Sequence, residues 1–168
     1  MPAIEPAPLM LWGHPPDGTP APIAWSTVIE RLQETDDYWL VTAGAGGPAP
    51  RPVWGLWIEH RLLLSVGSST HWRNLRTSDR IAVHVGDAHD VVILEGRGRK
   101  ETDPSTLARL IEPYNQKYDW NWESSSDIGD ILAVEPHTVF AWRAAPNEQA
   151  QTSPFPLAAG KWVVRNDP

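Results

Sequence analysis

Short apolar segments separated by turn residues run through most of this sequence, and they limit its possible folds more than any other feature. Some alternate apolar and polar residues, as Ile81, Val83 and Val85 do, which is typical of strands with one buried face. Helical spacing of apolar residues is found in few places. We therefore expect a mainly β protein of the α+β class, an antiparallel barrel or sandwich of about six to seven strands with short helices. A doubly wound α/β fold is not expected.

The expected strands follow one another closely along the chain. The glycines and prolines of residues 44–50 predict a loop after the first strand, and Glu59 with His60 predicts a tight turn after the second. Gly96 and Gly98 lie inside a strand, where glycine marks a bulge or a close approach of another backbone. The expected strands are residues 38–43, 51–58, 61–66, 81–85, 91–99, 138–143 and 161–165.

Three segments have helical patterns. We expect helices over residues 25–35 and, more briefly, over residues 70–77. Asp103 followed by Pro104 predicts the start of a third helix, because aspartate is a good N-cap and proline is tolerated in the first turn. Pro113 should kink or restart that helix.

The chain is long enough for one well-buried domain and short for two. Residues 1–24 contain seven prolines and are interpreted as a Pro-rich N-terminal arm that wraps the domain or a partner subunit. Residues 25–168 are interpreted as the domain itself. No secretory signal is recognised, and no apolar run has the length of a membrane span, so we expect a cytoplasmic protein without membrane contact.

The charge balance excludes some classes of partner. Fourteen Lys and Arg residues against 21 Asp and Glu residues give a net charge of −7, so a broad nucleic-acid-binding surface is not expected and any anion site must be local. The sequence has no cysteine, which excludes disulfides, thiol nucleophiles and thiolate metal sites. His84 and His89 lack a third ligand at a convincing spacing, and we expect no metal site.

A local anion site is indicated at residues 64–75, where an apolar strand ends and a basic amphipathic helix begins. Ser68, Ser69 and Thr70 are suited to cap that helix, which would leave backbone N–H groups free for a phosphate. Arg73 and Arg76 add full charges one turn apart. The alternative is an ordinary corner with a solvated basic face.

The chain shows no clustered acid–base set and none of the common nucleophile, metalloprotease or phosphate-loop motifs. An enzyme of this sequence would therefore take its reactive group from a bound cofactor. Ten tryptophans suit a planar aromatic ligand or a dimer interface, although core packing alone also explains them. An aromatic ring system is best placed along the strand of residues 51–58, next to the anion site.

Several motifs, in a fixed order, resemble the pyridoxamine 5′-phosphate oxidase-like superfamily of flavin and deazaflavin split β-barrels, and in particular its flavin/deazaflavin oxidoreductase branch. The similarity covers about residues 26–143, with a weaker echo at residues 158–164. The motifs are YWLVTAG (38–44), PVWGLW (52–57), LLLSVG (62–67), RNLRTSDRIAVHV (73–85), DVVILEG (90–96), YNQKYDW (114–120) and VFAW (139–142).

The resemblance implies a homodimeric split barrel with two cofactor sites at the subunit interface. The phosphate would lie against the residues that match Ser65 to Asn74, and the ring against those that match Pro52 to Trp54, while the partner subunit closes the pocket. The implied cofactor-binding residues are Pro52, Val53, Trp54, Ser65, Val66, Gly67, Ser69, Thr70, His71, Trp72, Arg73 and Asn74, with Lys117, Trp142, Lys161 and Trp162 contributing from the partner's side.

The sequence departs from the family pattern where charge matters. Family members commonly carry an Arg and Lys pair before the R-N-L triplet, whereas this chain has residues 69–72, Ser-Thr-His-Trp, which attract a phosphate less strongly. His71 is expected to contact the phosphate or ribityl chain, or else to lie at the surface. Trp72 is expected to line the pocket or to pack in an interface. Arg73 either contacts the phosphate or forms an ion pair with Asp79 or a partner carboxylate.

The leading functional expectation is an oxidoreductase that binds FMN or the deazaflavin coenzyme F420 and transfers a hydride to a small conjugated substrate. The alternative is a non-catalytic protein that binds FMN, haem or a tetrapyrrole in the same pocket. Oxidation of pyridoxamine 5′-phosphate itself is not favoured, because the sequence shows no second basic cluster for a substrate phosphate.

Overall fold

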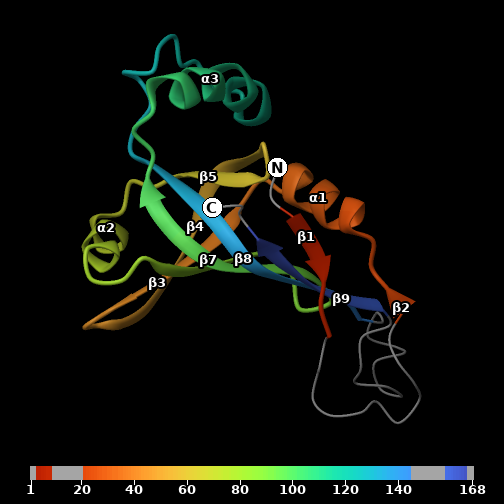
Figure 1. Cartoon of the computed structure of the whole chain (residues 1–168). Helices are drawn as coiled ribbons and strands as arrows, with labels where there is room; N and C mark the ends of the chain where they lie inside the picture. The colour runs from red at the N-terminus through yellow and green to blue at the C-terminus, as the bar shows by residue number, and fades with distance from the viewer. Residues whose placement is uncertain (1–2, 9–20, 145–157, 166–168) are drawn as a thin grey trace.

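The computed structural model describes residues 3–8, 21–144 and 158–165, and its strands form one nine-stranded sheet (Figure 1). The order of elements is the one that the sequence pattern predicts, with two additional short strands near the N-terminus. The strands are β1 (Ala3–Pro6), β2 (Ala21–Pro22), β3 (Tyr38–Gly44), β4 (Gly47–Ile58), β5 (Arg61–Ser65), β6 (Arg80–Gly86), β7 (Asp90–Lys100), β8 (Ile131–Arg143) and β9 (Ala158–Arg165), and the helices are α1 (Trp25–Glu34), α2 (Ser69–Leu75) and α3 (Pro104–Tyr118).

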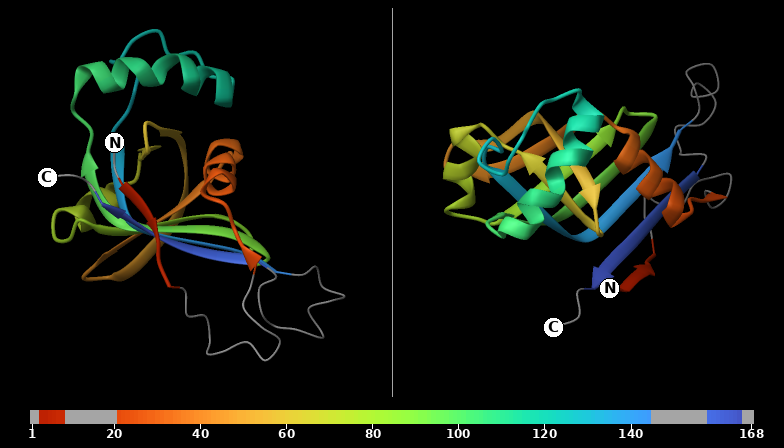
Figure 2. Two further views of the ribbon diagram at one scale, coloured as in Figure 1. Left: turned by 45° about the vertical axis from the view of Figure 1, so that its right-hand side comes forward. Right: turned by 90° about the horizontal axis from the view of Figure 1, so that it is seen from above.

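Six of the strands close into a ring. They follow the order β8, β5, β4, β3, β6 and β7, and β7 pairs again with β8, with every pair antiparallel. The sheet curls around a common interior in the two views of Figure 2. The expected antiparallel split barrel with few helices is therefore confirmed.

The barrel is split because β8 serves two partners along one edge. Residues 131–134 pair with β5, whereas residues 138–143 pair with β9, which leads away from the ring. Between them the register with β7 shifts at Glu95 and Gly96, so that His137 forms a bulge. A Cβ on Gly96 would collide with the Glu135 carbonyl oxygen, so the predicted role of this glycine in a bulge and close approach is confirmed.

Apolar side chains fill two separate regions. The interior of the barrel holds the larger core, to which α1 contributes Val28 and Leu32, both fully buried. The second core lies between α3 and the outer face of β4, β5 and β8, where Leu110 and Tyr114 of the helix meet Leu56 and Leu63 of the strands. Figure 2 shows α3 lying across the barrel on that side.

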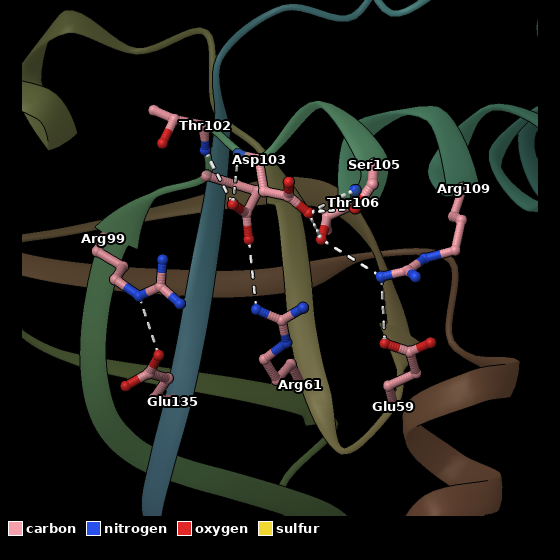
Figure 3. A network of polar contacts seen from close by, with 10 residues as sticks. Glu59, Arg61, Arg99, Thr102, Asp103, Ser105, Thr106, Arg109 and Glu135 are labelled. Carbon is pink, nitrogen blue, oxygen red and sulfur yellow. Dashed lines mark hydrogen bonds and ion pairs between the residues drawn. The ribbon is translucent and has the colours of Figure 1, made fainter.

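A network of polar contacts fixes the start of α3 (Figure 3). Asp103 is the N-cap residue, and its carboxylate accepts hydrogen bonds from the Ser105 hydroxyl at 2.6 Å and the Thr106 backbone N–H at 2.9 Å, which lower its pKa. The buried carboxylate of Glu101 accepts the Asp103 backbone N–H at 3.0 Å and pairs with Arg61 at 3.3 Å. The predicted helix start is thereby confirmed.

Three sequence expectations need correction. Residues 44–50 are not a loop, because β4 begins at Gly47 and only two residues separate it from β3. The strand expected at residues 138–143 begins earlier, at Ile131, since β8 is continuous across the bulge. α3 does not restart at Pro113 but continues to Tyr118, because packing of Leu110 and Tyr114 against the strands holds the helix on both sides of the proline.

Two short strands from the N-terminal arm pair with β9. β1 lies antiparallel to Trp162–Arg165, and β2 lies parallel to its first residues. Within the described ranges, no helix has the length and apolar character needed to cross a membrane.

Candidate functional site

β4 has two halves with different neighbours, and this division organises the candidate site. Residues 47–53 pair with β3, and residues 54–58 pair with β5. Because β3 and β5 lie on opposite edges of β4, each half of the strand has one edge without a strand partner. The backbone groups on these two edges meet very different surroundings.

The direction of each backbone amide in β4 follows from the hairpin turns at its ends. Gly44 and Gly47 close a two-residue turn to β3, and Ile58 and Arg61 close another to β5. The two residues that close such a turn face each other, and the backbone N–H of each donates to the carbonyl oxygen of the other. Odd-numbered residues of β4 therefore direct their N–H and C=O groups towards β3, and even-numbered residues direct theirs towards β5.

The half of β4 that lies past the end of β3 is closed by α3. Gly55 has no strand partner on that side, and its backbone N–H donates to the Tyr118 hydroxyl at 2.8 Å. The Gly55 carbonyl oxygen lies 2.8 Å from the same hydroxyl and accepts from Lys117 Nζ at 3.3 Å. Trp54 stacks on Tyr118 with ring centroids 4.9 Å apart, and Trp120 meets Trp54 edge-on.

Lys117 is the cation of this closed half. Its ammonium group donates to the Tyr38 hydroxyl at 3.2 Å and lies 5.1 Å and 5.4 Å from the ring centroids of Tyr38 and Tyr118. Burial lowers the pKa of Lys117, although the Asp36 carboxylate opposes this, and burial raises the pKa of both tyrosines. In this arrangement the lysine satisfies backbone and hydroxyl acceptors of its own chain.

The other half of β4 leaves an edge of carbonyl groups only. Pro48, Pro50 and Pro52 occupy the even positions, so the edge that faces away from β3 has no N–H donor at any of them. Arg51 Nη1 donates to the Pro50 carbonyl oxygen at 2.7 Å, in keeping with an oxygen that faces away from β3. We call residues 48–52 the acceptor edge.

The α2 corner, residues 65–74, begins where β5 ends. Ser65 is the last β5 residue opposite Trp54, and the backbone N–H of Val66 donates to the carbonyl oxygen of Asp130, the residue before β8, at 2.9 Å. Gly67 is exposed, and a Cβ there would meet no atom within 4 Å. Ser68 is the N-cap residue of α2 but makes no side-chain capping bond, so the predicted capping role of the hydroxyl residues is wrong.

α2 is divided between a solvent side and an interior side. Ser69 and Arg73 are exposed and Thr70 is half-buried, with Arg73 Nη2 3.4 Å from the Thr70 hydroxyl. Trp72 is half-buried, and its indole N–H donates to the Val66 carbonyl oxygen at 2.9 Å. Trp72 thereby fastens α2 to the end of β5.

His71 and Asn74 point into the protein from α2. Thr42 of β3 lies between them, with its hydroxyl 2.9 Å from His71 Nδ1 and accepting from Asn74 Nδ2 at 3.0 Å. His71 is fully buried, and its Nε2 has no partner among the described residues. Burial, with a smaller contribution from the Arg51 charge, lowers the pKa of His71, so its imidazole is neutral at pH 7.

The positions expected on the partner's side are dispersed within the chain. Lys117 bonds the carbonyl oxygen of Gly55, the residue after Trp54, within its own chain. Trp142 and Lys161 are half-buried on β8 and β9, where Lys161 lies over the Phe140 ring at 5.3 Å. Trp162 is a core residue, 5% exposed. A cofactor contact from a second subunit remains a prediction for these positions.

The structure brings the predicted residues of β4 and the α2 corner together, and it adds site residues that were not predicted. Pro52, Val53 and Trp54 on β4 and the residues from Ser65 to Arg73 border the same end of the barrel, because Trp54 and Ser65 are register partners. Tyr118, Thr42 and the part of the acceptor edge before Pro52 were not predicted from the sequence. A signal for the last was present, since prolines at every second position fit a strand with one unpaired edge.

Two further surface features involve β3 and its neighbour β6. His84 stacks on Trp39 at a ring separation of 6.0 Å, and no group of three potential metal ligands gathers anywhere in the described ranges. A hollow of about 530 Å³ is lined by residues of β3, β6 and β7 together with Pro48 of the acceptor edge, and Arg80 and Arg97 are among its lining residues. Arg97 is already engaged by the Asp79 carboxylate, at 2.7 Å and 2.8 Å.

Comparison with solved structures places the fold among known proteins. A conserved hypothetical protein of Mycobacterium tuberculosis aligns over 72% of this chain and 85% of its own, with 16% identity and a TM-score of 0.61. A Clostridium acetobutylicum protein of the pyridoxinephosphate oxidase family, related to general stress protein 26, aligns over 70% and 87%, with 17% identity and a TM-score of 0.56. A FAD-binding protein of Mesorhizobium loti aligns over 84% and 96%, with 15% identity and a TM-score of 0.54.

No curated protein matches the sequence. The family model for pyridoxamine 5′-phosphate oxidase matches residues 27–143, which include the barrel strands from β3 to β8 and all of α2 and α3. Since the match covers more than half of the chain, this protein belongs to the pyridoxamine 5′-phosphate oxidase family.

Proposed function

We propose that the protein binds FMN or coenzyme F420 between the acceptor edge of β4 and the α2 corner, as a homodimer, and uses it to transfer a hydride to a small conjugated substrate. The observation that carries the proposal is that one half of β4 lacks a strand partner beside an exposed corner that carries hydroxyl and guanidinium groups. Family membership and the likeness to a FAD-binding protein support a flavin-type cofactor.

The solvent side of α2 fits the phosphate of such a cofactor. Ser69, Thr70 and Arg73 present two hydroxyl groups and one guanidinium group, and the neighbouring Gly67 leaves open space. Arg73 makes no ion pair with a described carboxylate, so its charge is available to an anion. His71 is turned onto Thr42 and contributes no charge here.

β4 fits the ring. Its carbonyl groups at Pro50 and Pro52 lie on the free edge, and the Trp54 indole, 40% exposed, is fixed at the end of that edge by Tyr118. A rigid aromatic surface restricts where a flat ring can lie, which orients it for transfer.

The bound cofactor would supply the hydride, and the chain would position and shelter it. Arg73 and the α2 hydroxyls would hold its anionic end, and β4 would hold its ring. Exclusion of water from the ring requires a cover, since Trp54 and Gly67 are exposed in the single chain. A second copy of the chain is the cover that we propose.

The outer face of the sheet supports the proposed dimer. Trp39 is 41% exposed, and half-buried apolar side chains continue from it across β3, β7 and β8 as Val41, Ile93, Phe140 and Trp142. Exposed aromatic patches of this kind are typical of interfaces. Sedimentation equilibrium should give twice the mass of the chain, and a monomer at micromolar concentration would reject the homodimer.

Cofactor titration tests the binding proposal. Either FMN or F420 should bind with micromolar affinity or better, measured by the change in cofactor fluorescence. Arg73→Gln should raise the Kd about tenfold, because a charge-assisted hydrogen bond is lost. Arg165→Gln removes another exposed arginine, which lies on β9 and pairs with Glu5, and should leave the Kd unchanged. Absence of binding to both cofactors would overturn the proposal.

One observation favours a non-catalytic binding protein as the second candidate. The α2 corner presents no carboxylate or imidazole on its solvent side, because His71, its one histidine, faces the interior. Binding of FMN, haem or a tetrapyrrole without turnover of quinones, enones or bilins would support this function. Measurable reductase activity with any of them would reject it.

A further inference from the structure

We infer that the acceptor edge of β4 recognises the imide N–H of the cofactor's pyrimidine ring and is indifferent to the atom at ring position 5. The inference rests on the proposed function and deepens it, because it states which part of the ring the edge reads. It follows from the identity and direction of the backbone groups in residues 48–52.

The edge has acceptors and no donors. Even-numbered residues of β4 point away from β3 in this half, and all three are prolines, which have a carbonyl oxygen but no N–H. In the described part of the chain, the carbonyl oxygens of Pro48 and Pro52 accept no hydrogen bond, and that of Pro50 accepts only the Arg51 guanidinium. An exposed guanidinium is readily displaced into solvent.

Ligand chemistry then decides what such an edge can select. The isoalloxazine ring of FMN and the deazaflavin ring of F420 share an imide N–H, numbered N3, flanked by two carbonyl groups. They differ at position 5, where FMN has a nitrogen that accepts a hydrogen bond and F420 has a C–H group. A backbone carbonyl pairs with N3–H in both rings, whereas recognition of N5 in oxidised FMN would require a backbone N–H that the prolines remove.

Three ligands distinguish recognition of N3–H from recognition of the atom at position 5, in one titration series on the full chain. FMN is compared with 5-deaza-FMN, which keeps N3–H and replaces N5 by C–H, and with N3-methyl-FMN, which keeps N5 and lacks the imide proton. All three carry the same phosphate and ribityl chain. We expect 5-deaza-FMN to bind within twofold of FMN and N3-methyl-FMN to bind at least tenfold more weakly.

The outcomes distinguish the inference from the proposed function. Equal binding of FMN and N3-methyl-FMN, or a tenfold loss for 5-deaza-FMN, would overturn the inference and leave flavin binding in place. Failure of all three ligands, and of F420, to bind would overturn both. The readout is a dissociation constant, so it does not depend on a substrate.

Discussion

The two halves of β4 differ in how the chain satisfies the same kind of unpaired backbone edge. Past the end of β3, the Gly55 N–H and C=O groups are met by Tyr118 and Lys117 of α3, and Trp54 lies under an aromatic stack. Past the end of β5, the chain supplies prolines in place of partners and leaves carbonyl oxygens free. One half is thus completed by the protein itself, while the other is protected from strand addition and remains open to a small ligand.

The contrast is sharpest for two glycines, Gly55 in the closed half of β4 and Gly67 in the α2 corner beside the other half. An alanine Cβ at Gly55 would lie 2.5 Å from Leu64 Cδ2 and 2.7 Å from the Leu63 carbonyl oxygen, and the latter is backbone that cannot move aside. Gly55→Ala should therefore lower the free energy of unfolding by about 3 kcal/mol or more. Gly67→Ala, in the open corner, should change it by less than about 0.5 kcal/mol. Urea unfolding of both variants is the measurement, and similar losses would contradict the distinction.

Proline scanning tests the assigned direction of the β4 amides. Arg51→Pro removes an N–H that faces β3 and leaves a ladder acceptor unpaired, so the free energy of unfolding should fall by about 2 kcal/mol. Pro52→Ala alters the free edge and should cost less than about 1 kcal/mol, through the greater freedom of the unfolded chain. Thermal unfolding followed by circular dichroism compares the two. A larger loss for Pro52→Ala would show that the assigned directions are wrong.

The stability of the half of β4 that α3 closes should depend on one hydroxyl group. Tyr118→Phe leaves the Gly55 N–H without its partner and should cost about 1.5 kcal/mol in urea unfolding. Tyr114→Phe is the comparison variant, because the Tyr114 ring packs in the same second core but its hydroxyl bonds Ser65 instead of Gly55. Equal stability of Tyr118→Phe and the wild type would mean that water replaces the hydroxyl.

Acidification should slightly lower the free energy of unfolding, through His71 of the α2 corner. Its pKa is lowered in the folded protein, so the unfolded chain takes up a proton first, and the free energy of unfolding falls as the pH drops below about 6.5. Unfolding of wild type and His71→Gln is compared at pH 8 and pH 5.5, with His137→Gln, an exposed histidine, as control. The acid-induced loss should shrink in His71→Gln alone. An unchanged loss there would assign the effect to other groups.

Local periodicity predicted the barrel well. The alternation of Ile81, Val83 and Val85 gave the correct buried face of β6, and the paired signal of Asp103 and Pro104 gave the start of α3. Such features depend on residues close in sequence. The family resemblance, which used the order of several motifs at once, is also confirmed.

Prediction from sequence was weakest where segments far apart in the chain satisfy each other's hydrogen-bonding groups. Residues 44–50 were interpreted as a loop because proline breaks an internal ladder, yet alternate prolines are compatible with a strand that is paired on one side only. The bonds of Tyr118 to Gly55 and of His71 to Thr42 span 63 and 29 residues. No local pattern reports such contacts, and for that reason the inward direction of His71 was not foreseen.

The most direct test of the account is a crystal structure of the protein with FMN or F420 bound. The ring should lie against the carbonyl groups of Pro50 and Pro52, with the phosphate at Ser69, Thr70 and Arg73 and a second copy of the chain over it. A ring that contacts neither Pro50 nor Pro52, for example one bound over Arg80 and Arg97 in the neighbouring hollow, would contradict the assignment of this half of β4 as the cofactor site.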